Sequence, residues 1–271
     1  MIFFMLSACF ISMISCGKDD EKNNEQEITI KDVQNETFYL DDISINMIGV
    51  VGGEFIMGAT SEQEDYAFEN EFPTHRVKLS SFWIGETEVT QELWSAVMNN
   101  NPSEFKEPQK PVESVSYADC KLFITELNNK LSSQLGDRHF RLPTEAEWEY
   151  ASRGGNKSWG CTFSGSNNIN DVGWYSANSD NQTHVVKTKS PNELGIYDMC
   201  GNVFEWCSDW YDGKYSNDMQ INPVGPENGT RRVVRGGSFV DNSGDCRNTT
   251  RYGGNLQGIF NSFGFRLVLS E

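Results

Sequence analysis

The sequence predicts an α+β domain with little regular secondary structure. Residues 43–58 and 77–85 alternate apolar with polar positions, which is typical of half-buried strands. Three segments between residues 90 and 155 carry a helix-capping residue followed by apolar positions at helical spacing. From residue 154 to residue 260 the chain is rich in Gly, Asn, Ser and Asp and has no long periodic run, which indicates loops and short strands.

The predicted helices begin at Thr90, at Ser116 and at Thr144, whose hydroxyls can each accept a hydrogen bond from the first helical turn. Gly154 and the glycine after it end the third helix. Cys120 falls on the apolar stripe of the second helix, so we expect it to be a buried core residue and not a reactive thiol.

Composition narrows the class of protein and of partner. The chain has 271 residues, of which 12% are aromatic, enough to bury one large core. Its formal net charge of −17 disfavours nucleic acid and anionic lipid as partners, and suits an exported protein, calcium or basic partners. The three histidines lie far apart without ligand spacing, which argues against a zinc site.

The N-terminal segment predicts export. Residues 1–15 are uncharged, apolar and too short to span a bilayer, so we interpret them as a lipoprotein signal peptide. Cys16 is then the lipidated residue, residues 16–42 a flexible acidic tether, and residues 43–271 the folded domain. The alternative is a buried N-terminal strand, since no Lys or Arg precedes the apolar run. Export would place the protein in the bacterial cell envelope as an outer-membrane lipoprotein, periplasmic or surface-exposed, held to the membrane only by its lipid.

Five further cysteines remain if Cys9 is removed with the signal peptide and Cys16 is lipidated. An oxidising compartment permits disulfides, but five is an odd number and the sequence does not specify their pairing. These residues are Cys120, Cys161, Cys200, Cys207 and Cys246.

Several motifs occur in order along the chain. They include Gly53-Glu54-Phe55-Ile56-Met57-Gly58, Glu86-Thr87-Glu88-Val89-Thr90, Arg141-Leu142-Pro143-Thr144-Glu145-Ala146-Glu147-Trp148-Glu149-Tyr150-Ala151, Gly201-Asn202-Val203-Phe204-Glu205-Trp206, Arg235-Gly236-Gly237-Ser238-Phe239 and Gly264-Phe265-Arg266. Together they resemble the formylglycine-generating enzyme family, or sulfatase-modifying factor domain, over roughly residues 45–268. The resemblance implies a loop-rich α+β fold that is a variant of the C-type-lectin-like fold.

The resemblance also implies a catalytic site. Family members that make formylglycine oxidise a sulfatase cysteine with molecular oxygen and Cu(I), which two enzyme cysteines hold because Cu(I) prefers thiolates. Those two positions correspond to Asp241 and Cys246 here, and Ser238 is retained. Aspartate is a hard oxygen ligand, so the thiolate pair is broken and copper binding is disfavoured. A second copper ligand would have to come from Cys200, Cys207 or Asp241.

A calcium site is the second implication of the resemblance. It assigns side-chain oxygens of Asp198 and Glu205 and the carbonyl oxygens of Gly201 and Val203 as ligands. Calcium accepts mixed carboxylate and carbonyl oxygens, and we expect this cofactor. The alternative is a turn without metal, which Asp, Gly and Asn at this spacing also form.

Three functions follow from these observations. The sequence favours a binding module of the cell envelope, whose ligand is an exported protein or a glycan. The alternatives are a divergent copper- and oxygen-dependent oxidase acting on sulfatases or another exported protein, and a subunit of an envelope complex. For a glycan, aromatic side chains in the loops could form the platform: Trp174, Tyr175, Trp210, Tyr211 and Tyr252.

Overall fold

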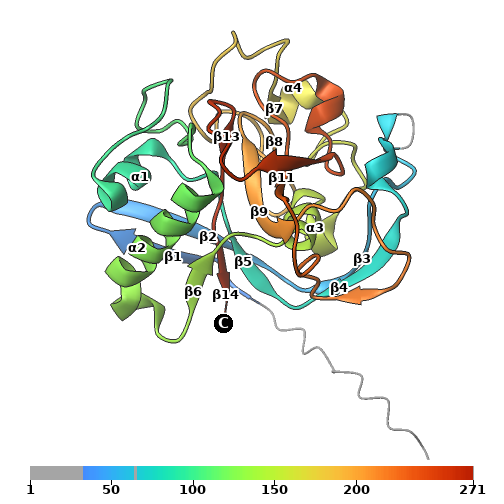
Figure 1. Ribbon diagram of the computed structural model, residues 1–271, viewed down its shortest axis with the longest axis horizontal. Helices are drawn as coiled ribbons and strands as arrows, with labels where there is room; N and C mark the ends of the chain where they lie inside the picture. The colour runs from blue at the N-terminus through green and yellow to red at the C-terminus, as the bar shows by residue number, and fades with distance from the viewer. Residues whose placement is uncertain (1–32, 64–65, 271) are drawn as a thin grey trace, which may run out of the picture.

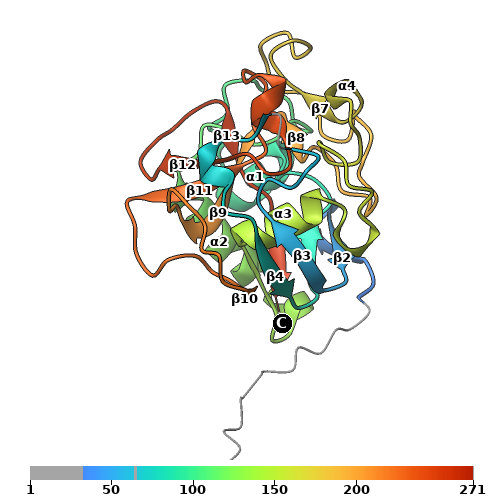
Figure 2. The ribbon, with the colours of Figure 1, turned by 90° about the vertical axis from the view of Figure 1, so that its right-hand side faces the viewer.

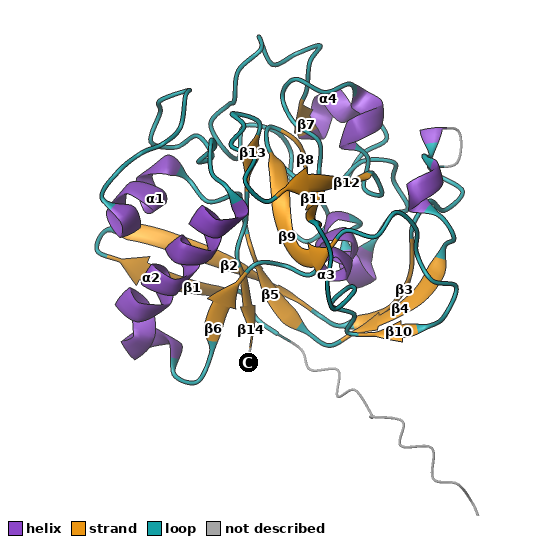
Figure 3. Cartoon of the chain, in the orientation of Figure 1, coloured by secondary structure: helices purple, strands orange, loops and turns teal. Residues whose placement is uncertain are grey.

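The computed structural model describes residues 33–63 and 66–270 (Figure 1). The predictions made for residues 1–15 and for Cys16 lie outside these residues. Within the described part, no helix is both long enough and apolar enough to cross a membrane. The α+β class is confirmed, and loops make up most of the part of the molecule around β7 to β13 (Figure 3).

A five-stranded sheet brings the two ends of the described chain together. Its strands, in spatial order, are β1 (Glu36–Leu40), β2 (Ile43–Val50), β5 (Phe82–Gly85), β14 (Val268–Ser270) and β6 (His139–Arg141). β1 pairs with β2 along its whole length, and Phe38 and Leu40 are buried. The prediction that the flexible tether extends to residue 42 is therefore wrong, because residues 36–40 already belong to the sheet.

Three smaller sheets complete the fold. The first has the order β10 (Gln220–Ile221), β4 (His75–Leu79) and β3 (Gly53–Met57). The second has the order β12 (Arg251–Asn255), β11 (Arg231–Arg235), β9 (Phe204–Trp210) and β13 (Phe263–Gly264). The third joins β7 (Gly173–Trp174) to β8 (Cys200–Gly201) in parallel.

The helices confirm the three predicted starts. They are α1 (Gln91–Met98), α2 (Tyr117–Leu135), α3 (Glu145–Ser152) and the short α4 (Ile169–Val172). The hydroxyls of Thr90, Ser116 and Thr144 each accept a hydrogen bond from the backbone N–H three residues on, as expected for caps. Short 3₁₀ turns are η2 (Glu69–Glu71), η3 (Gly155–Lys157) and η4 (Ser243–Cys246).

Two large apolar clusters form the core. In the first, α1 and α2 pack against the five-stranded sheet, and the rings of Trp94 and Phe123 stack with centroids 5.1 Å apart. Cys120 is fully buried in this cluster, as predicted. In the second, α3 packs between β3 and the strands β9 and β11 around Trp148 (Figure 2). β9 and β11 are packed into these clusters, and the loops next to these strands form the candidate site.

Candidate functional site

The loop between β11 and η4, residues 236–242, turns on two adjacent glycines. Gly236 and Gly237 have φ angles of 94° and 70°, in the left-handed region where a side chain causes strain. The buried hydroxyl of Ser238 donates a hydrogen bond to a carboxylate oxygen of Asp241. The backbone N–H of Asp241 donates to the carbonyl of Ser238 at 3.1 Å. The loop therefore closes on itself through Ser238 and Asp241.

Cys246, at the end of η4, points into the protein. It is fully buried, in a small apolar cluster with Phe163, Ile169, Val172 and Cys200. Burial in this cluster raises the pKa of the Cys246 thiol well above its usual range, and the neighbouring Cys200 sulfur adds to the effect. A covered, neutral thiol is a poor nucleophile and is closed to an incoming substrate.

The candidate partners of Cys246 differ in where they lie and in what they contact. Cys200, in β8, belongs to the same cluster, and burial raises its pKa to about 12. Cys207, in β9, is fully buried in the core cluster around Trp148, away from that pair. The carboxylate of Asp241 already accepts a hydrogen bond from the hydroxyl of Ser238. Among the thiols of the described residues, Cys200 is therefore the one that shares a cluster with Cys246.

The loop at residues 198–203 runs beside the glycine turn. Asp198, Gly201 and Asn202 all have left-handed φ angles, of 58°, 78° and 59°. A Cβ atom on Gly201 would lie 2.0 Å from the carbonyl oxygen of Trp174, so only glycine fits there. The N–H of Gly201 donates to the carbonyl of Gly236 at 2.8 Å. This hydrogen bond fixes the two loops against each other.

Asp198 and Glu205 differ in how their oxygens are used. One oxygen of Asp198 accepts the N–H of Lys187 at 2.8 Å, whereas the other is buried without a hydrogen-bond partner among the described residues. Glu205 accepts the indole N–H of Trp148 at 2.7 Å and two guanidinium bonds from Arg266, both at 2.6 Å. One carboxylate oxygen of Asp198 is therefore free to bind a ligand, whereas both oxygens of Glu205 already accept hydrogen bonds.

Glu88 is a third buried carboxylate at this place, and sequence reasoning did not assign it a role. It accepts hydrogen bonds from the amide of Asn202 at 3.0 Å and the N–H of Val203 at 3.3 Å. Burial and the negative charges of Asp198 and Glu205 raise the pKa of Glu88 well above its usual range. Burial likewise raises the pKa of Asp198 to about 6. In the sequence, Glu88 stands out only as part of the motif that ends at Thr90. No local pattern indicates that it contacts residues more than a hundred positions away.

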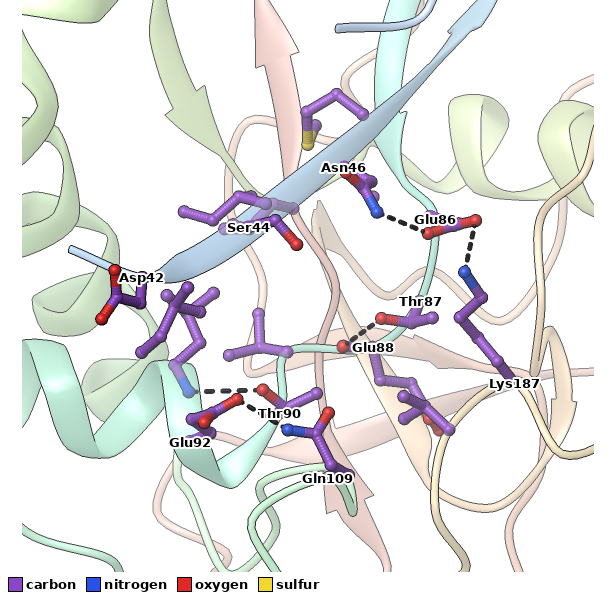
Figure 4. A pocket seen from close by; sticks show the side chains of 18 residues that line it. Asp42, Ser44, Asn46, Glu86, Thr87, Glu88, Thr90, Glu92, Gln109 and Lys187 are labelled. Carbon is purple, nitrogen blue, oxygen red and sulfur yellow. Dashed lines mark hydrogen bonds and ion pairs between the residues drawn. The ribbon is translucent and has the colours of Figure 1, made fainter. Parts of the chain in front are cut away.

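Glu88 also lines a pocket of about 310 Å³ between β2 and the segment after β5 (Figure 4). At one end of the pocket Glu86 accepts hydrogen bonds from Lys187 at 2.7 Å and from Asn46 at 2.9 Å. Further acidic side chains, from Asp42 and Glu92, leave the lining negatively charged overall. Glu88 thus connects this pocket to the 198–203 loop.

Comparison with known proteins identifies the family. The model of the sulfatase-modifying factor enzyme 1-like domain matches residues 41–271. The chain belongs to this family. It is 35% identical over 243 residues to chaperone protein LppX of Paenibacillus barcinonensis, covering 73% of this chain and 80% of that protein. It is 33% identical over 184 residues to the formylglycine-generating enzyme of Thermomonospora curvata, covering 61% of this chain but only 55% of the enzyme.

A solved structure agrees with the family assignment. Treponema denticola variable protein 1 superposes with a TM-score of 0.78 at 32% identity, over 86% of this chain and 98% of that one. The formylglycine-generating-enzyme fold expected from the sequence is thereby confirmed.

The residues of this family member do not fit copper. A Cu(I) site of the expected kind needs two thiolates facing the substrate. Asp241 offers a hard carboxylate that is bound to Ser238, and Cys246 is covered by its apolar cluster. Across the described residues, no group of three or more His, Cys, Asp or Glu side chains is arranged to hold a metal ion.

Of the two carboxylates expected to bind calcium, Asp198 has an oxygen without a described partner, whereas both oxygens of Glu205 are bound by Arg266. Glu88, Asp198 and Glu205 interact electrostatically inside the protein, and Arg266 is the positive charge that they share. The unpartnered oxygen of Asp198 is the kind of hard donor that calcium takes, and carbonyl oxygens can complete such a set. Bound calcium would neutralise the surplus negative charge and hold the loop.

The five expected platform aromatics already have partners. Trp174 stacks on His184 at 3.8 Å and lies under the ammonium of Lys189 at 4.0 Å. The guanidinium of Arg232 lies 3.5 Å from the ring of Trp210. The other three are half-buried, with hydrogen bonds at the hydroxyls of Tyr175, Tyr211 and Tyr252. Each of these side chains is thus held by a contact inside the protein, and the glycan platform stays a prediction.

Proposed function

We propose that this chain is a binding module of the cell envelope that docks a segment of an exported protein at the face bearing the glycine turn. The observation that carries the proposal is the state of the family's catalytic loop. Asp241 replaces a thiolate and is hydrogen-bonded to Ser238, while Cys246 is covered. The fold around this loop is intact, so the face can still recognise a chain that it does not oxidise.

A row of aromatic rings supports a docking role. Phe68, Tyr252, Phe204, Phe263 and Phe260 follow one another with centroid separations of 6.2, 5.8, 5.3 and 5.0 Å. We call these five residues the aromatic row. Its two ends are exposed, at 40% for Phe68 and 47% for Phe260. Exposed aromatic groups of this kind favour contact with a protein partner.

Charge indicates the chemistry of that partner. The hydroxyl of Tyr252, in the aromatic row, donates to a carboxylate oxygen of Asp245 at 2.6 Å. Asp241 lies in the adjoining loop, and the chain as a whole carries a net charge of −17. A segment with both basic and apolar side chains complements this face. The relative whose name describes it as a chaperone protein also supports a protein partner over a glycan.

A peptide titration tests the docking proposal. We expect an unlabelled peptide alternating Arg with Leu or Phe to bind, and its Glu-for-Arg version not to bind. Phe68→Ala with Phe260→Ala should weaken binding about tenfold, a loss of ~1.4 kcal/mol. Leu122→Ala, at a side chain 50% exposed on α2, is the matched control and should leave affinity unchanged. Equal binding of both peptides, or an equal effect of the control, contradicts the proposal.

The envelope location rests on the N-terminal segment. We propose that residues 1–15 direct export and that Cys16 carries the lipid of an outer-membrane lipoprotein. In a Gram-negative host, labelled palmitate should enter the wild-type chain and not Cys16→Ser. Labelling that persists in this variant would contradict the assignment.

Calcium is proposed as a structural cofactor held by Asp198 and Glu205 with the carbonyls of Gly201 and Val203. The support is the partnerless oxygen of Asp198 and the shared negative charge. Added calcium should raise the melting temperature, and EDTA should lower it. Asp198→Asn should remove the response, while exposed Asp137→Asn should keep it. No shift in the wild type would rule out the site.

One observation supports the oxidase alternative. Cys200 lies in the same cluster as Cys246, so a thiolate pair for Cu(I) would have to use these two residues. Cys200 and Cys246 lie beneath the loop at residues 236–242 and not on its surface. Peptide turnover with copper, described at the end of the Discussion, separates this alternative from docking.

A further inference from the structure

Two thiols from distant parts of the chain meet under the glycine turn. Cys200 lies in β8 and Cys246 at the end of η4, and both side chains are fully buried. They share one apolar cluster with Phe163, Ile169 and Val172. The other three cysteines of the described chain lie outside this cluster.

The backbone draws the two cysteines together from both sides of Gly236-Gly237. On one side, the residue after Cys200 donates its N–H to the carbonyl of Gly236 at 2.8 Å. On the other side, a Cβ atom on Gly237 would lie 2.6 Å from the sulfur of Cys246 and 3.0 Å from its Cα. Only a glycine allows the η4 segment to approach this closely.

The surroundings of the sulfurs decide which chemistry suits them. The Cys200 sulfur accepts the N–H of Ser164 at 3.2 Å, and in the described part no basic side chain is hydrogen-bonded to either sulfur. Burial raises the pKa of both thiols. Two thiolates on a metal would put charge into this apolar cluster at a large desolvation cost, whereas a disulfide is neutral.

We propose that Cys200 and Cys246 form an intrachain disulfide that joins the 198–203 loop to the η4 segment. The oxidant is a disulfide, either oxidised glutathione or the active-site disulfide of a thiol oxidoreductase. The Cys200–Cys246 bond forms as the oxidant's S–S bond breaks, and the two thiol protons pass to the two thiols released. Because both sulfurs are buried, exchange takes place before the cluster closes or during local opening. This proposal does not depend on docking at the aromatic row.

Peptide mapping of the wild-type chain tests the pairing directly. The protein is refolded with oxidised and reduced glutathione, denatured without reductant, alkylated and digested. Cleavage after Phe204 or Trp206 separates Cys200 from Cys207, which otherwise share a tryptic peptide. We expect two peptides, one with Cys200 and one with Cys246, joined in a single species that reduction splits into the two free peptides, whose masses add up to about 2 Da more because each sulfur gains a hydrogen. Alkylation of both residues, or a link from Cys246 to another cysteine, overturns the proposal.

Thermal unfolding supplies a second test. A disulfide closing a chain loop of this length should raise the melting temperature of oxidised over reduced wild type by about 10 °C. The double variant Cys200→Ala with Cys246→Ala should show no such difference. The control Cys207→Ala, also at a fully buried thiol, should keep it. A difference that persists in the double variant, or two free thiols that together hold one Cu(I), contradicts the disulfide.

Discussion

Replacement of Gly237 by Ala tests the shape of the candidate loop. Its φ of 70° costs a residue with a side chain about 1–2 kcal/mol. The new Cβ would lie 2.6 Å from the sulfur of Cys246 and 2.9 Å from the carbonyl oxygen of Asp245. Crowding against backbone atoms is not relieved by a rotamer change and adds about 1–3 kcal/mol. We therefore expect Gly237→Ala to lower the free energy of unfolding by about 2–5 kcal/mol.

Two further glycines separate strain from crowding in the same urea-unfolding assay. Gly195 has a φ of 88°, but no described atom lies within 4 Å of a Cβ there, so Gly195→Ala should cost only ~1–2 kcal/mol. Gly244 has neither a left-handed φ nor a described atom within 4 Å, so Gly244→Ala should change stability by less than about 0.5 kcal/mol. If Gly237→Ala costs no more than Gly195→Ala, the close approach of Cys246 to the turn is refuted.

Two other predictions concern buried charges. Glu205→Gln leaves the buried guanidinium of Arg266 without its counter-charge and should cost ~3–5 kcal/mol, whereas Glu54→Gln, at the exposed ion pair with Arg76, should cost less than ~1 kcal/mol in urea unfolding. An equal loss of unfolding free energy in the two variants would contradict the buried Glu205–Arg266 ion pair. Burial raises the pKa of Asp209 to about 7, so between about pH 4 and 7 the folded state holds this proton and the unfolded state releases it. The free energy of unfolding falls with rising pH through that window, and Asp209→Asn should gain stability relative to wild type from pH 4.5 to 7.5. If the difference in unfolding free energy between Asp209→Asn and wild type does not change with pH, the pKa of Asp209 is not raised.

The helices were predictable because their signals are local. Thr90, Ser116 and Thr144 each cap the helix that directly follows, and Cys120 is buried because its helix presents that stripe to the sheet. β1 carried a weaker local signal, since Phe38 and Leu40 alternate with polar residues in only five positions. β1 forms a strand because it pairs with β2, which buries its apolar side chains.

The site was less predictable because it depends on contacts between distant segments. The motifs indicated the loop at Ser238 and the carboxylates at Asp198 and Glu205, but no local pattern states that Cys246 faces inward towards Cys200. The contacts of Glu88 form only when the residues after β8 meet the segment after β5 in the fold.

Turnover of a substrate peptide measures the central proposal most directly. The purified chain is reconstituted with Cu(I), supplied with oxygen and incubated with a Cys-x-Pro-x-Arg peptide, and mass spectrometry follows conversion of the cysteine to an aldehyde. The Thermomonospora curvata enzyme, prepared identically, is the positive control. Because Asp241 is held by Ser238 and Cys246 is covered, we expect the peptide cysteine to be recovered unchanged. Aldehyde formation that Cys246→Ser abolishes would contradict the account and establish an oxidase.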